Sequence, residues 1–176
     1  MNIPQPTTEP VIEGNIITLP PDWMAYGEVY AHIRNYTATL AGKVDMTYRG
    51  HDPVQIHIDG VQGELAFHMW LTGSGFEPTC GTYKAQADVG EDLEIRCRVH
   101  KGESWPKELI VRRNDDPAKR YVLIVRDHTL GANTFDVKGW VWGYEAHEVE
   151  PKNHGRHNPA HFVPYSMLHD PAGLRA

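Results

Sequence analysis

Apolar residues recur at steps of three and four after residue 22, a spacing that places them on one face of an α-helix. The pattern runs from Trp23 to about Ala41. Asp22 stands where an N-cap is expected, and Gly42 stands where helices commonly end. Residues 1–20 open with a polar, proline-containing stretch. The sequence therefore predicts an extended N-terminal arm over residues 1–20, followed by an amphipathic helix.

A second helical pattern begins near Asp59 or Gly60 and ends at residues 72–75, where a Thr-Gly-Ser-Gly run favours a turn. Its apolar positions are Val61, Leu65, Phe67, Met69 and Leu71. Because these side chains need an apolar surface to cover them, we expect this helix to pack against a sheet formed by the rest of the chain.

From residue 83 the period changes to two, which is typical of half-buried β-strands. Residues 83–89 and 93–99 alternate in this way and are joined by three residues, 90–92. A loop of that length predicts a hairpin in which Val89 lies opposite Leu93, with both side chains facing the core.

Two denser apolar runs follow at residues 109–111 and 121–125, separated by the turn-forming run Asn-Asp-Asp-Pro. They predict a second hairpin through the centre of the sheet. Residues 135–141 predict a further strand. The chain after about His147 is rich in His, Pro and Asn, and we expect irregular structure there with one short helix.

The order of these elements predicts a single mixed α/β (α+β) domain over residues 21–176. A chain of 176 residues can bury a core, and its 40% hydrophobic and 23% charged residues are ordinary for a globular protein. No apolar run approaches the ~18 residues that cross a bilayer, so no membrane partner is expected. Two cysteines without a signal peptide favour the cytoplasm.

The net charge of −6 gives the chain no overall basic surface for nucleic acid. Two points keep nucleic-acid binding open despite the negative net charge. Basic residues are concentrated between Arg96 and Arg126, so the field need not be uniformly negative. A bound divalent cation would also cancel the charge of clustered carboxylates locally.

The register of the first predicted hairpin places Asp88 opposite Glu94. Two like charges that face each other across a strand pair repel, and a bound cation offsets the repulsion. A few oxygen ligands with some water suit Mg²⁺ or Mn²⁺. Glu64 supplies a third carboxylate from the second helix, flanked by two glycines that permit close approach. If this helix packs on the hairpin, the three acids converge.

Taken singly, each acid also has a plainer interpretation. Glu64 is as readily a solvent-facing helix carboxylate, Asp88 a turn residue, and Glu94 and Arg96 solvated strand positions. The combination of the acids in this order is what favours a site.

Asp88 followed by Glu94-Ile95-Arg96, with Glu64 on an upstream helix, resembles the PD-(D/E)xK nuclease superfamily, including small bacterial and phage proteins of that group. The resemblance covers residues 58–168. It implies a restriction-endonuclease-like central mixed sheet with helices packed on it, and Mg²⁺- or Mn²⁺-dependent hydrolysis of phosphodiester bonds. It also implies that Asp88 and Glu94 bind the metal and that Glu64 completes the site.

One position departs from the family pattern, because Arg96 stands where the family has lysine. Arginine stays protonated, so it can hold a phosphate but is a poor general base. Lys84 is predicted on the same strand face and could substitute for that lysine. The expected catalytic set is therefore Glu64, Asp88, Glu94, Arg96 and Lys84. The alternative is a catalytically degenerate nuclease-fold protein that binds nucleic acid or a protein partner.

The partner implied is nucleic acid, DNA before RNA, in the cytoplasm of a bacterium or of the host of a phage; a homodimer and an assembly role without nucleic acid stay open. Two further clusters have less specific patterns. The histidines at 147, 154, 157 and 161 lack the ligand spacing of structural zinc sites. Trp140 and Trp142 share a strand face, where their rings could stack on bases, pack in the core or be covered by the C-terminal segment.

Overall fold

The structure is a computed structural model of the chain, and it describes residues 3–42, 52–78, 87–102, 108–153 and 158–175. The helices and strands in these ranges are β1 (Val11–Glu13), β2 (Ile16–Thr18), α1 (Pro21–Leu40), α2 (Pro53–Thr72), β3 (Leu93–His100), β4 (Glu108–Arg112), β5 (Arg120–Asp127), β6 (Thr134–Trp142), α3 (Gly143–Glu148) and β7 (Ala160–Pro164). Two 3₁₀ turns follow, η1 (Tyr165–Met167) and η2 (Pro171–Leu174). The predicted mixed α/β class is confirmed.

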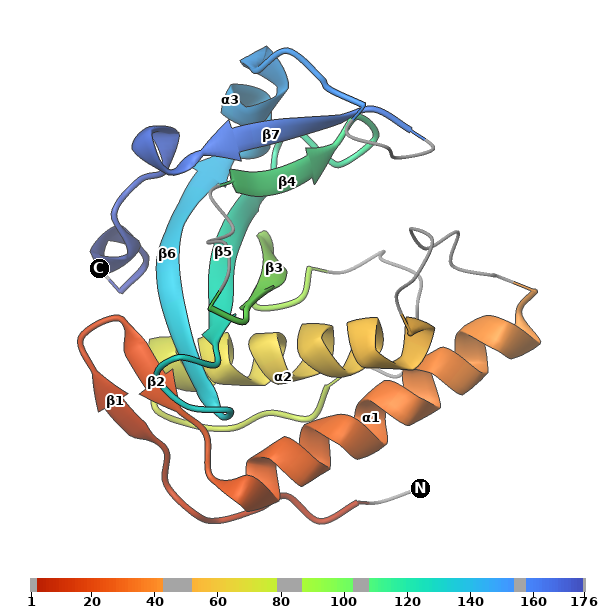
Figure 1. The fold of residues 1–176 in the computed structure, drawn as a ribbon, viewed down its shortest axis with the longest axis vertical. Helices are drawn as coiled ribbons and strands as arrows, with labels where there is room; N and C mark the ends of the chain where they lie inside the picture. The colour runs from red at the N-terminus through yellow and green to blue at the C-terminus, as the bar shows by residue number, and fades with distance from the viewer. Residues whose placement is uncertain (1–2, 43–51, 79–86, 103–107, 154–157, 176) are drawn as a thin grey trace.

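The main sheet has five strands in the order β1-β2-β6-β5-β3. Strands β3 and β5 run parallel, and the other neighbours are antiparallel. A second sheet consists of β4 and β7 alone, paired antiparallel. Figure 1 shows α1 and α2 at one end of the long strands β5 and β6, and β4, β7 and α3 grouped at the other end.

Side chains alternate along β5 between two apolar cores. Val122 and Ile124 face the core that α1 and α2 cover, and Ile95 of β3 faces the same way. Tyr121 and Leu123 face a smaller core shared with β4, β7 and α3. The period-two pattern of the sequence therefore records burial on both faces of the sheet.

Both predicted helices form. α1 has Pro20 as its N-cap residue, so the assignment of Asp22 as the N-cap is wrong; Asp22 lies in the first turn. α2 begins at Pro53, before the predicted start, because Asp52 caps the helix by accepting a hydrogen bond from the Val54 N–H over 2.9 Å. Its end at the left-handed Gly73 is confirmed.

The second predicted hairpin is wrong. β4 pairs with β7, which the sequence did not predict, and β5 lies between β3 and β6 in the main sheet. In the N-terminal arm, β1 and β2 form a hairpin that extends the main sheet beside β6. The short helix expected after residue 147 lies slightly earlier, as α3. Most of the strand predicted at 83–89 lies outside the described residues.

Candidate active site around strand β3

A tight turn leads into β3. Val89 and Leu93 exchange two backbone hydrogen bonds, with N–O distances of 3.1 and 3.3 Å, which confirms the predicted pairing of these residues. Asp88 precedes this pair, and its carboxylate accepts a hydrogen bond from the Ile95 N–H over 2.8 Å. The Asp88 side chain therefore lies alongside the start of β3, bound to the backbone of the residue that follows Glu94.

Glu94 is a buried carboxylate on β3, with 3% of its surface exposed. It lies in register with Tyr121 of β5, so its side chain is on the face turned toward β4 and β7. Lys119 donates a hydrogen bond to Glu94 Oε1 over 2.7 Å, and Arg96 Nη1 lies 3.7 Å from Glu94 Oε2. Two cations therefore offset the cost of burying this charge.

Arg96 lies two residues further along the same face of β3. Its Nη2 donates to Asp115 Oδ2 over 2.8 Å, and its guanidinium carbon lies 5.2 Å from the centroid of the Tyr121 ring. Asp115 is fixed in turn, because the same oxygen accepts the Arg112 N–H over 2.8 Å. The guanidinium is thus oriented by an acid and an aromatic ring.

Arg96 keeps its proton in this environment. Burial alone would lower the pKa of the guanidinium, but the neighbouring carboxylates of Asp115, Glu94 and Asp88 outweigh it and raise the pKa. Two of the three predicted acids, Asp88 and Glu94, are therefore near enough to Arg96 to stabilise its charge. A guanidinium held in this state can donate to an anion but cannot accept a proton from water.

Glu64 is held on α2 by a cation from α1. Arg34 donates to both carboxylate oxygens, Nη1 to Oε1 over 2.8 Å and Nη2 to Oε2 over 2.9 Å. The preceding residue, Gly63, packs directly on β3: a Cβ there would lie 2.6 Å from Cys97 Cβ. α2 therefore crosses the face of β3 that carries Cys97, opposite to the face that carries Glu94 and Arg96.

The structure thus does not gather the three predicted acids on one side of the sheet. Asp88 and Glu94 lie around Arg96, whereas Glu64 lies in the helical layer with Arg34. Lys84, the predicted substitute for the family lysine, lies outside the described residues. Each of the three carboxylates also has a further interaction within the protein, so none of them is free.

A cage of three protein ligands does not fit this arrangement. Across the described ranges, no three His, Cys, Asp or Glu side chains are grouped so that they could hold a metal ion. Mg²⁺ is commonly bound through one or two carboxylates, several waters and a substrate phosphate. Of the predicted acids, Asp88 and Glu94 are the two that could belong to such a set, since both carboxylates border the first residues of β3 and share Arg96 as a neighbour.

Sequence reasoning missed three residues that pair with the predicted site residues: Lys119 with Glu94, Asp115 with Arg96, and Arg34 with Glu64. Lys119 and Asp115 belong to the segment between β4 and β5, whose turn residues were interpreted only as a connection. Arg34 comes from α1, and no local pattern links it to α2. The one signal that could have indicated these partners is chemical: a buried carboxylate needs a cation nearby.

Of the two other clusters, the tryptophan pair is described in full and the histidine cluster only in part. The His147 and His161 rings lie 4.8 Å apart between centroids, and 154–157 is outside the described residues. Trp140 and Trp142 lie on one face of β6, as predicted, with centroids 5.9 Å apart. The Arg120 guanidinium lies over both rings.

Comparison with known proteins finds no match: no family model matches the chain, and no curated protein or solved structure is significantly similar to it. Among the helices of the described residues, none has the length and apolar character that a membrane span requires.

Proposed function

We propose that this protein is a small Mg²⁺-dependent nuclease, acting on DNA in the cytoplasm of a bacterium or of the host of a phage. The observation that carries the proposal is the gathering of Asp88, Glu94 and a protonated Arg96 at the start of β3, in the sequence order typical of PD-(D/E)xK nucleases, with Glu94 and Arg96 on one strand. Groups whose pKa is shifted by burial and by charged neighbours, as that of Arg96 is, are common at functional sites.

Each residue has a role that follows from its chemistry. Asp88 and Glu94 are the residues that would hold the metal, which when bound supplies a Lewis acid and a more acidic water. Arg96 donates hydrogen bonds to a non-bridging phosphate oxygen and stabilises the charge of the transition state. Lys119 is a positioning residue, because its hydrogen bond orients the Glu94 carboxylate. Glu64 is farther from this chemistry and positions α2 through Arg34.

The second candidate is a catalytically degenerate nuclease-fold protein that binds nucleic acid or a protein partner. The Arg96–Asp115 ion pair favours it, because the guanidinium already has a carboxylate partner and cannot act as a base. In this candidate the ion pairs are permanent and the face binds a phosphate backbone without cleaving it.

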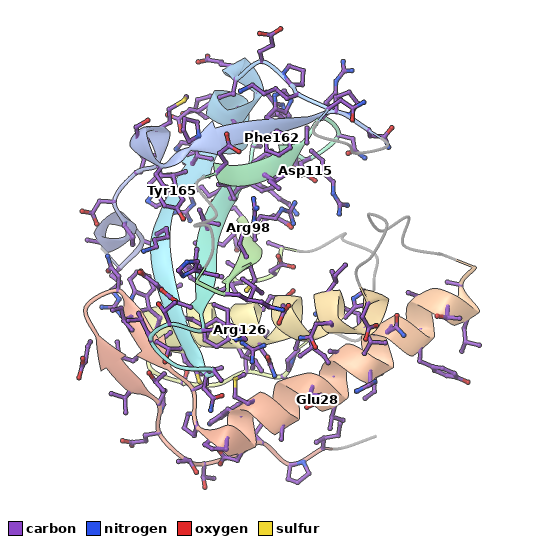
Figure 2. The ribbon with its side chains drawn as sticks, viewed as in Figure 1. Glu28, Arg98, Asp115, Arg126, Phe162 and Tyr165 are labelled. Carbon is purple, nitrogen blue, oxygen red and sulfur yellow. The ribbon has the colours of Figure 1, made fainter. Side chains whose placement is uncertain are left out.

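The deciding experiment is cleavage of plasmid DNA and of single- and double-stranded oligonucleotides in Mg²⁺, Mn²⁺ or EDTA. We expect wild-type cleavage in the metals, none in EDTA, and loss of cleavage in Asp88→Asn and Glu94→Gln. Glu28→Gln is the matched control, since it makes the same carboxylate-to-amide change on an exposed turn of α1, distant from Asp115 in Figure 2. A wild-type protein that binds DNA without cleaving it selects the degenerate candidate.

A further inference from the structure

Arg98 is a third side chain on the same face of β3 as Glu94 and Arg96, because strand positions two apart point the same way. It is half-buried, and Figure 2 shows it beside β3, toward β4. Its Nη1 donates to the backbone carbonyl of Glu108 at the start of β4 over 3.1 Å. The side chain therefore lies between the two sheets.

Arg98 differs from the other cations near the site in its counter-charge. Arg96 and Lys119 each pair with a carboxylate within 2.8 Å. No carboxylate in the described part of the chain forms an ion pair with Arg98. Burial lowers the pKa of Arg98 below its ordinary value. The Glu108 carbonyl accepts from one N–H group of Arg98, and a guanidinium carries several further donors.

The Tyr165 phenol lies close enough to Arg98 for each group to affect the pKa of the other. Burial raises the pKa of Tyr165, at the start of η1, to about 12, even though the positive charge of Arg98 acts to lower it. The phenol therefore keeps its proton at neutral pH. Glu108 is the acid whose charge favours the charged form of Arg98, and it forms no ion pair with it. Among the described residues, the Arg98 guanidinium thus has a carbonyl acceptor and no carboxylate ion-pair partner, so it can also donate to an anion.

We propose that Arg98 binds a phosphate group between β3 and β4, and that in the proposed function this is the phosphate next to the one held at Arg96. The identity of the anion rests on that function; the anion site itself rests on Arg98. Strand residues two apart are separated by roughly 6.6 Å, so one nucleic-acid strand that follows β3 would meet both guanidinium groups. Arg96 contacts the scissile phosphate, and Arg98 fixes the position of the strand.

The test is fluorescence anisotropy of labelled single-stranded and duplex DNA in EDTA, at several salt concentrations, with inorganic phosphate as a competitor. We expect Arg98→Gln to weaken binding about tenfold and to reduce the slope of log affinity against log salt by about one, as the loss of one phosphate contact does. Glutamine keeps a donor for the Glu108 carbonyl. Arg113→Gln is the matched control on an exposed arginine beyond β4 and should bind like wild type.

Thermal melting separates binding from folding. If Arg98→Gln does not fold, Arg98→Lys takes its place, because lysine keeps the charge but not the planar fork, and it should weaken binding several-fold with a wild-type melting temperature. A folded Arg98 variant with wild-type affinity and salt slope overturns the proposal and leaves the nuclease function standing. Arg98-dependent binding without cleavage in Mg²⁺ or Mn²⁺ supports the phosphate site and overturns the nuclease function. Wild-type protein that binds neither DNA nor phosphate overturns the phosphate site.

Discussion

Arg34 donates two hydrogen bonds to the Glu64 carboxylate, and the pair joins α1 to α2 with both side chains largely removed from water. Glu64 itself is only 6% exposed. Because each charge compensates the other in a poorly solvated layer, removal of one partner leaves the other buried without its main counter-charge. Glu64 therefore has a structural role, because its ion pair with Arg34 holds α1 and α2 together.

Arg34→Met should therefore lower the free energy of unfolding by about 3 kcal/mol or more, the usual result of breaking a buried ion pair from one side. The double variant Arg34→Met/Glu64→Leu should recover a large part of that loss, since it replaces both charges with apolar groups of similar size. Urea denaturation of the single and double variants measures both effects. Strict additivity of the two single changes would show that the pair is not energetically coupled.

The two glycines that flank Glu64 in α2 should respond in opposite ways to alanine. Gly63→Ala places a Cβ 2.6 Å from Cys97 Cβ and 2.9 Å from its Sγ, so it should cost about 1 to 3 kcal/mol. Gly60→Ala meets nothing within 4 Å and should stabilise the helix by about 0.5 to 1 kcal/mol, because alanine has the higher helix propensity.

Thermal or urea unfolding compares these alanine variants. Cys97→Ala should not rescue Gly63→Ala, because alanine retains the Cβ that makes the closest contact. Equal effects of the two glycine changes would contradict the packing of α2 on β3.

The sequence predicted strands correctly where burial follows a local period, and failed where pairing depends on distant residues. The run at 109–111 looked like the hairpin partner of 121–125 because turn residues separate the two. The turn does form: the Asp115 N–H bonds to the Arg112 carbonyl over 3.0 Å. The strands then diverge into separate sheets, and Leu109 pairs with Val163 of β7. No local pattern identifies such a partner.

In the candidate site too, local features were predicted correctly and contacts with distant residues were not. Strand alternation correctly placed Glu94 and Arg96 on one face and Val89 opposite Leu93. The predicted repulsion between Asp88 and Glu94 suggested a cation, but the structure also supplies partners that the sequence could not reveal. Asp88 accepts a backbone N–H, and Glu94 accepts a hydrogen bond from the Lys119 ammonium group. Both partners depend on how the turn and β5 fold back beside β3.

Asp92 should make stability depend on pH in the acid range. Two hydrogen bonds from Arg120, with distances of 2.6 and 2.8 Å, lower the pKa of this carboxyl below its ordinary value of 3.8. The ionised group therefore stabilises the folded state above about pH 4, and the contribution is lost as the pH falls through the lowered pKa.

The measurement is the melting temperature of wild type and of Asp92→Asn between about pH 2.5 and about pH 7, which covers the acid range in which this carboxyl titrates. Wild type should be the more stable near neutral pH, and the difference should shrink toward zero at the acid end. Glu28→Gln controls for the change in net charge. A difference between wild type and Asp92→Asn that grows as the pH falls would contradict the assigned direction of the pKa shift.

The choice between an enzyme and a binding protein depends most directly on Arg96. In an active site, Arg96→Ala removes the donor to the scissile phosphate and should lower kcat/KM by about a hundredfold or more. Arg96→Lys should retain or increase cleavage, because lysine restores the family residue and can lie close to the attacking water.

Arg113→Ala serves as the control for the Arg96 variants, since it removes one exposed positive charge outside the site. In a degenerate protein, wild type shows no metal-dependent cleavage, and Arg96→Ala only weakens nucleic-acid binding, with a salt slope reduced by about one. Single-turnover cleavage and anisotropy measured on the same preparations distinguish the two cases. Purified protein that neither cleaves nor binds DNA or RNA at low salt would exclude both, because phosphate binding by the protonated Arg96 is the step that the two cases share.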